Sequence, residues 1–245
     1  MGEGLTTREE GPAMANRSAL IIRHVPYEGV AGFRAPIEAA GYEIDRIDVS
    51  DENFPDRDLT EPDLVIMMGG PMGVYEQETH PWITCQLRRL ARRLEADRPT
   101  LGVCFGAQMI AAALGAEVRP GPRAEVGWHP LTVHDPAGPL RDLVGVPVLH
   151  WHGDTFTAPD GCEFLAASPA YAHQAFRRGP NLLALQFHAE MGLDPRYQAW
   201  LDEGNAMMQA AGTDADTMRR AHDEHGARAV AAGQAMITRW LERLG

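Results

Sequence analysis

One stretch of the sequence decides the expected fold: Pro99-Thr100-Leu101-Gly102-Val103, then Cys104, then Phe105-Gly106-Ala107-Gln108-Met109-Ile110. Residues 99–103 predict a short buried strand, and residues 107–114 predict the helix that follows it. Cys104 stands at the turn between them, and the nearby glycines remove Cβ atoms that would clash in so tight a turn. This layout is typical of a nucleophile elbow, which exposes its nucleophile above the carboxyl ends of a parallel sheet.

The elbow interpretation has a consequence for the chemistry of Cys104. Helix amide groups and the helix dipole stabilise a thiolate, so we expect the thiol pKa to fall from about 8.5 toward neutrality. The alternative is a small buried cysteine followed by a glycine-rich packing turn. The pattern Gly-x-Cys-x-Gly does not by itself separate these two interpretations.

Two other apolar strands end in residues that suit the same chemistry. Residues 182–187 run into His188-Ala189-Glu190, and side chains two apart on an extended chain point the same way. His188 and Glu190 are therefore candidates for a general base and the carboxylate that orients it. Residues 63–68 run into Gly69-Gly70-Pro71-Met72-Gly73, a loop that can aim backbone N–H groups at an oxyanion.

The glycine loop and the elbow each offer one expected oxyanion donor. Pro71 has no N–H, so the donor from the loop must be a glycine, and we choose Gly70. Phe105, the residue after the nucleophile, supplies the second donor in such elbows. The glycine loop is not a phosphate-binding loop, because no Gly-Lys-Ser/Thr follows it.

With these segments in order, the chain resembles the class I glutamine amidotransferases, most closely the glutaminase portion of GMP synthetases and their stand-alone relatives. The resemblance runs from about Ala19 to Glu190, and it rests on Gly69-Gly70-Pro71, on residues 102–108, on Trp151-His152-Gly153-Asp154 and on Phe187-His188-Ala189-Glu190. It implies that Cys104, His188 and Glu190 form a catalytic triad, and that substrate is contacted by Gln108, Trp151, His152 and Gly153. Ala189 departs from the family, which usually has proline there, and this loosens the turn between His188 and Glu190.

Triad order supports the resemblance. In α/β-hydrolases the acid precedes the histidine, whereas here Glu190 follows His188. A papain-like protease would carry its cysteine near the mature N-terminus.

The expected fold class is α/β, with a doubly wound, mostly parallel sheet of the flavodoxin-like, class I glutaminase type. Strands are expected at 19–25 and 43–49, a helix at 33–40, and short strands at 118, 131–133, 146–150, 164–166 and 171–176. Residues 17–245 are expected to form a single domain with extra C-terminal helices at about 195–210 and 214–244, so that the extension covers 195–245. Residues 1–16 are expected to be a disordered lead, with Met14 as an alternative start.

Two further side-chain patterns, one of arginines and one of histidines, favour no functional site. Arg88, Arg89, Arg92 and Arg93 lie on an expected helix at 81–96, and we expect a solvated helix face. His150 and His152 are two apart, but no Cys or third His stands nearby at a suitable spacing. We therefore expect no metal site there, and the resemblance implies no cofactor.

Composition limits the setting of the protein. The chain has 245 residues, 44% of them hydrophobic, which leaves no room for a synthetase domain beside the glutaminase. A net charge of −12 argues against nucleic acid and anionic membranes as partners. Three cysteines, no signal peptide and no apolar run long enough to span a bilayer favour a reducing, cytoplasmic location.

Three functions remain open at this point. The first is a glutaminase that forms a Cys104 thioester and releases ammonia for a separate synthetase subunit. The second is a self-sufficient hydrolase of γ-glutamyl amides or peptides, which would use the same residues. The third is a non-catalytic regulatory or scaffold protein, which would not require nucleophile, base, acid and oxyanion donors together.

Overall fold

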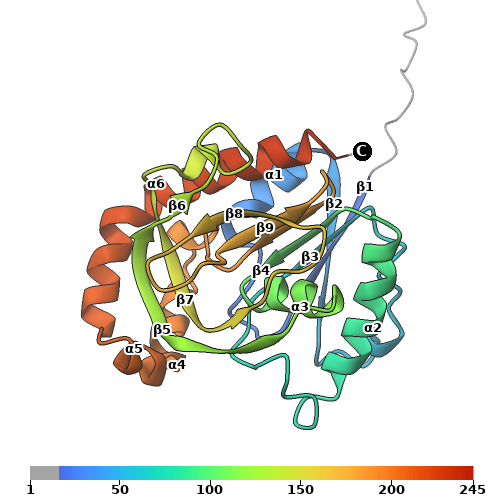
Figure 1. Ribbon diagram of the computed structural model, residues 1–245, viewed down its shortest axis with the longest axis horizontal. Coiled ribbons are helices and arrows are strands. Elements are labelled where there is room, and N and C mark those ends of the chain that lie inside the picture. The colour runs from blue at the N-terminus through green and yellow to red at the C-terminus, as the bar shows by residue number, and fades with distance from the viewer. Residues whose placement is uncertain (1–16, 245) are drawn as a thin grey trace, which may run out of the picture.

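The computed structural model describes residues 17–244, so the expected disordered lead at 1–16 lies outside the described residues (Figure 1). Within them, the main sheet has eight strands in the order β2-β1-β3-β4-β10-β9-β8-β6. The first five are mutually parallel: β2 (Tyr42–Asp48), β1 (Arg17–Arg23), β3 (Leu64–Met67), β4 (Thr100–Val103) and β10 (Leu182–Leu185). The last three run antiparallel to their neighbours: β9 (Ala175–Arg178), β8 (Glu163–Ala167) and β6 (Thr132–Val133). The expected mostly parallel sheet is confirmed.

Helices cover both faces of this sheet, as a doubly wound fold requires. Alternate side chains of each strand enter different cores, with Ile21 and Ile66 in one and Leu20 and Val65 in the other. The first core is closed by α1 (Arg34–Ala39) and α6 (Ala215–Leu241). The second is closed by α2 (Trp82–Glu95) and α3 (Phe105–Ala113). Single 3-10 turns lie at Ala31–Phe33, Phe54–Asp56, Arg141–Leu143 and Met191–Leu193.

A second sheet departs from the sequence expectation. In place of the short strands expected around 118 and 146–150, β5 (Val118–Pro130) and β7 (Pro147–Phe156) form a long antiparallel ribbon that arches beside the main sheet (Figure 1). Its pairing shifts register between Pro120 and Glu125. Prolines cannot donate hydrogen bonds to a neighbouring strand. Because they interrupt the alternation of polar and apolar residues here, the sequence pattern did not predict one long strand.

The C-terminal extension also differs in one detail. The helix expected at 195–210 is divided into α4 (Tyr197–Glu203) and α5 (Asn205–Ala210) at Gly204. A Cβ atom at Gly204 would lie 2.1 Å from Cζ2 of Trp151, so the glycine permits the chain to approach that ring closely. The helix α6 begins after Asp214, whose side chain accepts a hydrogen bond of 2.8 Å from the N–H of Thr217.

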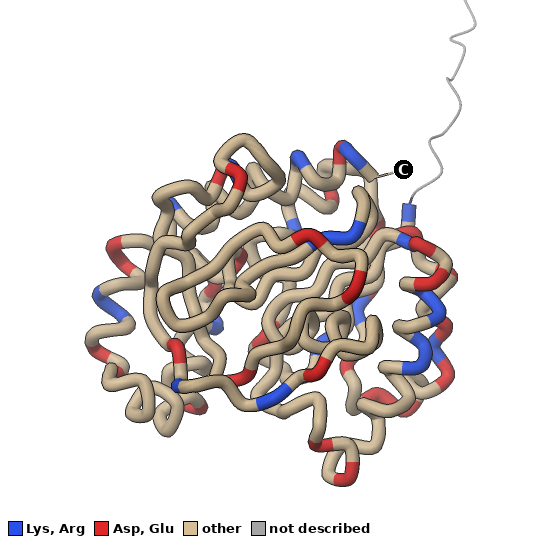
Figure 2. Tube along the Cα trace, viewed as in Figure 1, with Lys and Arg blue, Asp and Glu red and all other residues tan. Residues whose placement is uncertain are grey.

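The expectation that all four arginines of α2 form a solvated face is wrong for two of them. Basic residues follow α2 in Figure 2, and Arg88 and Arg92 are exposed, but Arg89 and Arg93 are buried. Arg93 donates to the carbonyl of Pro62 at 2.8 Å and to the Thr100 hydroxyl at 3.0 Å, and burial lowers its pKa to about 9. Buried arginine is tolerated here because carbonyl oxygens satisfy its N–H groups. Among residues 17–244 no helix combines the length and apolar character needed to cross a membrane.

Candidate active site

Cys104 lies at the tip of β4, where the chain turns into α3. Its backbone has φ 53° and ψ −110°, a conformation that residues other than glycine rarely adopt. The flanking glycines are needed for space: a Cβ at Gly106 would lie 2.1 Å from the carbonyl oxygen of Met67, and one at Gly102 would lie 2.6 Å from the backbone of Gly106. The segment therefore has the strained strand-to-helix turn that the sequence predicted.

His188 and Glu190 follow β10, next to Cys104 in the sheet. The backbone of His188 bridges to Leu149, donating its N–H to that carbonyl at 2.8 Å, which anchors the segment to β7. Nδ1 of His188 lies 2.6 Å from Oε1 of Glu190, and each residue is 1% exposed. The rings of His188 and Trp200 pack in a T-shaped arrangement, with ring centroids 4.7 Å apart. The His188 side chain also interacts with that of Cys104, so the structure brings together the three residues whose proximity the sequence predicted.

The electrostatics of Cys104 differ from the expectation. Burial raises the pKa of the Cys104 thiol, and the interactions with His188 and with the Phe105 N–H offset this only in part. The expected fall toward neutrality is therefore wrong, because loss of solvent outweighs the helix N-terminus. Burial would lower the pKa of His188, but the charges of Glu190 and Cys104 outweigh it and raise that pKa well above its ordinary value. His188 is consequently a stronger base than free imidazole.

The expected oxyanion donors come from two segments near Cys104. Gly70 lines the same cleft as the thiol, at the end of β3. The N–H of Phe105 interacts with the thiol itself and favours the thiolate. A Cβ at Gly70 would lie 2.7 Å from Sδ of Met72, so glycine allows the loop to fold tightly at this position.

The cleft in front of Cys104 has a volume of about 280 Å³. Residues of the resembled motifs line it, together with residues of the C-terminal helices: Gln108, Trp151, His152, Gly153, Trp200, Glu203 and Met207. The Cys104 thiol points at the carbonyl oxygen of Trp151, 3.7 Å away. The amide of Gln108 donates to Gln186 at 3.1 Å. The ring of His152 is held by Glu125, so its nitrogens face the protein and not the cleft.

Glu28, which no sequence motif indicated, also lines this cleft. Glu28 is 7% exposed, its Oε2 has no hydrogen-bond partner, and burial raises its pKa to about 7. A Cβ at Gly69 would lie 2.0 Å from that oxygen, so the glycine loop leaves room for the carboxyl group. The available signal was its position: Glu28 follows the first strand at its carboxyl end, where open α/β sheets bind ligands.

Comparison with known proteins agrees with this geometry. The sequence profile of the family described as "Glutamine amidotransferase class-I" matches residues 35–207. The chain is 29% identical to the glutamine amidotransferase-like protein YfeJ of Salmonella typhimurium over 181 residues, which is 70% of this chain and 74% of that protein. It is 33% identical to a glutamine-hydrolysing GMP synthase of Bdellovibrio bacteriovorus over 132 residues, 52% of this chain but only 23% of that enzyme.

Solved structures give the same result. A glutamine amidotransferase of Thermotoga maritima superposes with a TM-score of 0.80 at 27% identity, covering 94% of this chain and 100% of the other. A glutamine amidotransferase of Methylobacillus flagellatus shares the fold, with a TM-score of 0.76 at 22% identity, covering 95% and 96% of the two chains. The profile match, the relatives and the fold lead to one conclusion: the chain belongs to the class I glutamine amidotransferase family.

Proposed function

We propose that this protein hydrolyses the side-chain amide of glutamine through a thioester on Cys104. One observation carries the proposal: a strained elbow cysteine faces a small cleft, with the buried His188–Glu190 pair beside it. A strained backbone and a buried, hydrogen-bonded base are features that proteins retain at catalytic centres. Membership of the family supports glutamine amide hydrolysis in general.

In the proposed reaction Cys104 is the nucleophile, His188 transfers the protons and Glu190 orients His188. His188 accepts the Cys104 proton, and sulfur attacks the amide carbon of glutamine to give a tetrahedral oxyanion. The C–N bond breaks, His188 returns the proton to the nitrogen, and ammonia leaves a γ-glutamyl thioester. Water, deprotonated by His188, then cleaves the C–S bond to give glutamate and free thiol. Glu190 holds the imidazole in the tautomer that leaves Nε2 free for this exchange.

The remaining site residues receive supporting roles in this proposal. The N–H groups of Gly70 and Phe105 stabilise the oxyanion, and loss of one such donor typically raises the barrier by roughly 3 kcal/mol. Gln108, Trp151 and Gly153 hold the amino-acid end of the substrate. The role of His152 is to order this wall, because its ring nitrogens are engaged by Glu125 and by the carbonyl of Asp154.

Because the proposed reaction releases ammonia, we propose a partner that accepts it. The aligned part is 23% of the GMP synthase of Bdellovibrio bacteriovorus, so three quarters of that enzyme has no counterpart in the match. By analogy, the ammonia acceptor of the present protein would be a separate synthetase subunit.

A second function is favoured by one observation. The chain's own α4 and α5 line the cleft through Trp200, Glu203 and Met207, so the cleft is walled without a partner. Such a site suits a self-sufficient hydrolase of γ-glutamyl amides or peptides, in which an amine leaves in place of ammonia.

One experiment separates these functions. The purified chain and its Cys104→Ala variant are incubated with glutamine or with a γ-glutamyl dipeptide, and released glutamate is quantified by mass spectrometry. Slow, glutamine-restricted, Cys104-dependent release supports the glutaminase with a separate acceptor. Faster release from the dipeptide supports the self-sufficient hydrolase. No Cys104-dependent release, together with no labelling of Cys104 by a glutamine-analogue electrophile, would instead support a non-catalytic role.

A further inference from the structure

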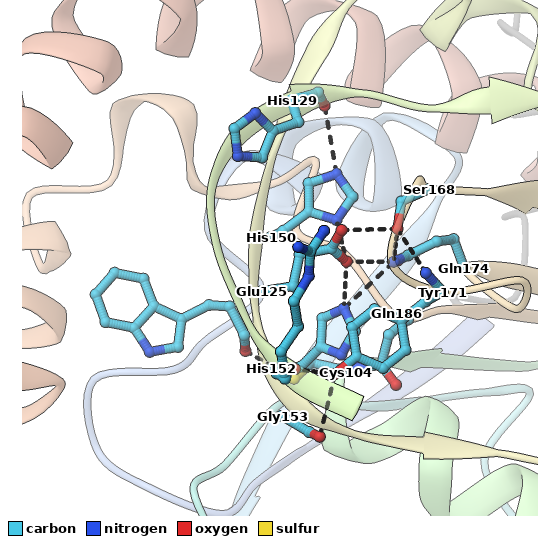
Figure 3. Close-up of polar contacts among 12 residues, drawn as sticks. Cys104, Glu125, His129, His150, His152, Gly153, Ser168, Tyr171, Gln174 and Gln186 are labelled. Carbon is cyan, nitrogen blue, oxygen red and sulfur yellow. Dashed lines mark hydrogen bonds and ion pairs between the residues drawn. The ribbon is translucent and has the colours of Figure 1, made fainter. Parts of the chain in front are cut away.

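A buried cluster of nitrogen and oxygen ligands lies behind the wall of the cleft. Figure 3 shows His150 and His152 on β7 and Glu125 on β5 with their polar atoms turned toward one another. Their exposed fractions are 0%, 3% and 9%, and Gln174, which completes the cluster, is 0% exposed. The sequence predicted no metal site here, because no Cys or third His stands near His150 and His152. Glu125, 27 positions before His152 in the sequence, is the third candidate ligand.

The spacing of the ligand atoms suits a tetrahedral cation. Oε2 of Glu125 lies 3.3 Å from Nδ1 of His150 and 3.0 Å from Nε2 of His152, and one ligand atom from each of the three residues lies within 4.8 Å of the other two. Zn²⁺ binds imidazole and carboxylate at about 2.0–2.2 Å, so tetrahedral ligand atoms stand about 3.4 Å apart. The two distances to Oε2 of Glu125 are therefore within about 0.4 Å of that spacing.

The opposite ring nitrogens have the partners that metal-bound histidines use. Nδ1 of His152 lies 3.0 Å from the carbonyl oxygen of Asp154, and Nε2 of His150 lies 3.3 Å from the carbonyl oxygen of His129. An N–H on each of these nitrogens leaves Nε2 of His152 and Nδ1 of His150 as lone pairs, both facing Glu125. Carbonyl partners of this kind fix the tautomer and orientation of ligating imidazoles.

Two buried atoms of the cluster lack a hydrogen-bond partner in the described structure. They are Nδ1 of His150 and Oε1 of Gln174. The Gln174 amide nitrogen lies 2.6 Å from Oε2 of Glu125 and 3.3 Å from Nε2 of His152, so rotating the amide by half a turn brings its oxygen beside these two ligand atoms. Ser168 donates to the other oxygen of Glu125 at 2.7 Å and orients the carboxylate. Buried polar atoms without partners are costly, and a cation would give Nδ1 of His150 a partner.

We propose that Glu125, His150 and His152 bind one divalent transition-metal cation, Zn²⁺ by the chemistry of the ligands, with the Gln174 amide oxygen as fourth ligand. The ion would join β5 to β7 and to the segment before β9. It would thereby brace the strand whose Trp151 carbonyl faces the Cys104 thiol. All four positions are filled by protein and the cluster is buried, so the site is structural and not catalytic.

The test uses the full chain carrying Cys104→Ala, which removes the catalytic thiol as a competing zinc ligand. Protein equilibrated with Zn²⁺ is desalted, and bound metal is measured by elemental mass spectrometry, with Mg²⁺ as a hard-cation control. We expect one Zn²⁺ per chain and no retained Mg²⁺. Zn²⁺ should also raise the midpoint of thermal unfolding, because a ligand that binds only the folded state stabilises it.

Three further variants locate the ion. His150→Gln and Glu125→Gln should each lower bound Zn²⁺ at least tenfold and abolish the thermal shift. His129→Gln is the matched control. His129 is exposed, and it contacts His150 through its backbone carbonyl, which the substitution keeps. It should retain the full stoichiometry. If Glu125→Gln does not fold, His150→Gln alone decides. Equal Zn²⁺ retention by His150→Gln and the parent, or no retention by the parent, would overturn the proposal.

Discussion

Nδ1 of His188 lies 2.6 Å from Oε1 of Glu190, and the two side chains are almost completely buried. In so dry a setting the negative charge of Glu190 has a strong effect on the imidazole, which is why the pKa of His188 is raised in spite of its burial. The contact joins residues that are two positions apart in the sequence. Its strength depends on the surrounding fold, which excludes solvent from both side chains.

Replacing Glu190 by glutamine should remove this charge while keeping the shape of the side chain. We expect turnover of a γ-glutamyl substrate to fall by roughly 10²–10⁴-fold, as when the orienting carboxylate of a triad becomes an amide. The pKa of His188, followed by NMR, should move down, because the charge that raised it is gone. Glu163→Gln, an exposed glutamate paired with Arg177, is the control. Unchanged turnover in Glu190→Gln would remove this residue from the mechanism.

The backbone strain at Cys104 predicts an unusual order of stability. Glycine tolerates φ 53° and ψ −110° far better than alanine does. Relief of such strain is worth about 1–3 kcal/mol, and added chain entropy takes back about 0.5–1 kcal/mol. Cys104→Gly should therefore be about 1 kcal/mol more stable than Cys104→Ala, by urea unfolding. If the alanine variant is the more stable of the two, the elbow is not strained. Both variants should lack turnover.

Burial of Glu28 predicts that stability depends on pH. Its pKa rises from 4.5 to about 7 on folding, so the folded state holds the proton more tightly than the unfolded chain does. This favourable contribution is complete below about pH 4.5 and is lost as pH rises through about 7. Glutamine mimics the protonated form at every pH. Glu28→Gln should therefore be only slightly more stable than the native chain at pH 5, and more stable by about 3 kcal/mol at pH 8.

Urea unfolding at both pH values checks this prediction, with Glu163→Gln as an exposed control whose effect should not change with pH. An equal effect of Glu28→Gln at pH 5 and pH 8 would mean that Glu28 stays charged in the folded protein. A residue that costs stability at neutral pH and lines the cleft is a candidate for a functional role. We therefore expect Glu28→Gln to lower turnover even where it raises stability.

The glycines of the site should differ sharply in their tolerance of a methyl group. At Gly106 the added Cβ would lie 2.1 Å from a backbone oxygen of β3, which cannot move without disturbing the sheet. Gly106→Ala should lose about 3 kcal/mol or more of unfolding free energy. Gly153→Ala meets no atom within 4 Å and should change stability by less than about 0.5 kcal/mol. Similar urea midpoints for both variants would show that the elbow packs less tightly than described.

Much of the fold and of the catalytic constellation could be predicted from sequence because the signals are local. The strand before Cys104, the glycines around it and the two-residue spacing of His188 and Glu190 each lie within a few positions. Apolar runs of strand length that end in glycine loops predict a parallel sheet, and the carboxyl ends of such strands share one edge. The family's motifs then appeared in order along the chain.

Burial and long-range pairing were decided by the tertiary structure alone. Arg93 and Glu28 look like ordinary surface charges in the sequence, yet both are buried, and burial lowers the pKa of Arg93 to about 9 and raises the pKa of Glu28 to about 7. Glu125 meets His150 and His152 only because β5 pairs with β7 across a proline-interrupted register. Local pattern determines where a strand ends and which residues stand there. The loss of solvent and the distant partners that set the chemistry of a side chain depend on packing between segments far apart in the chain.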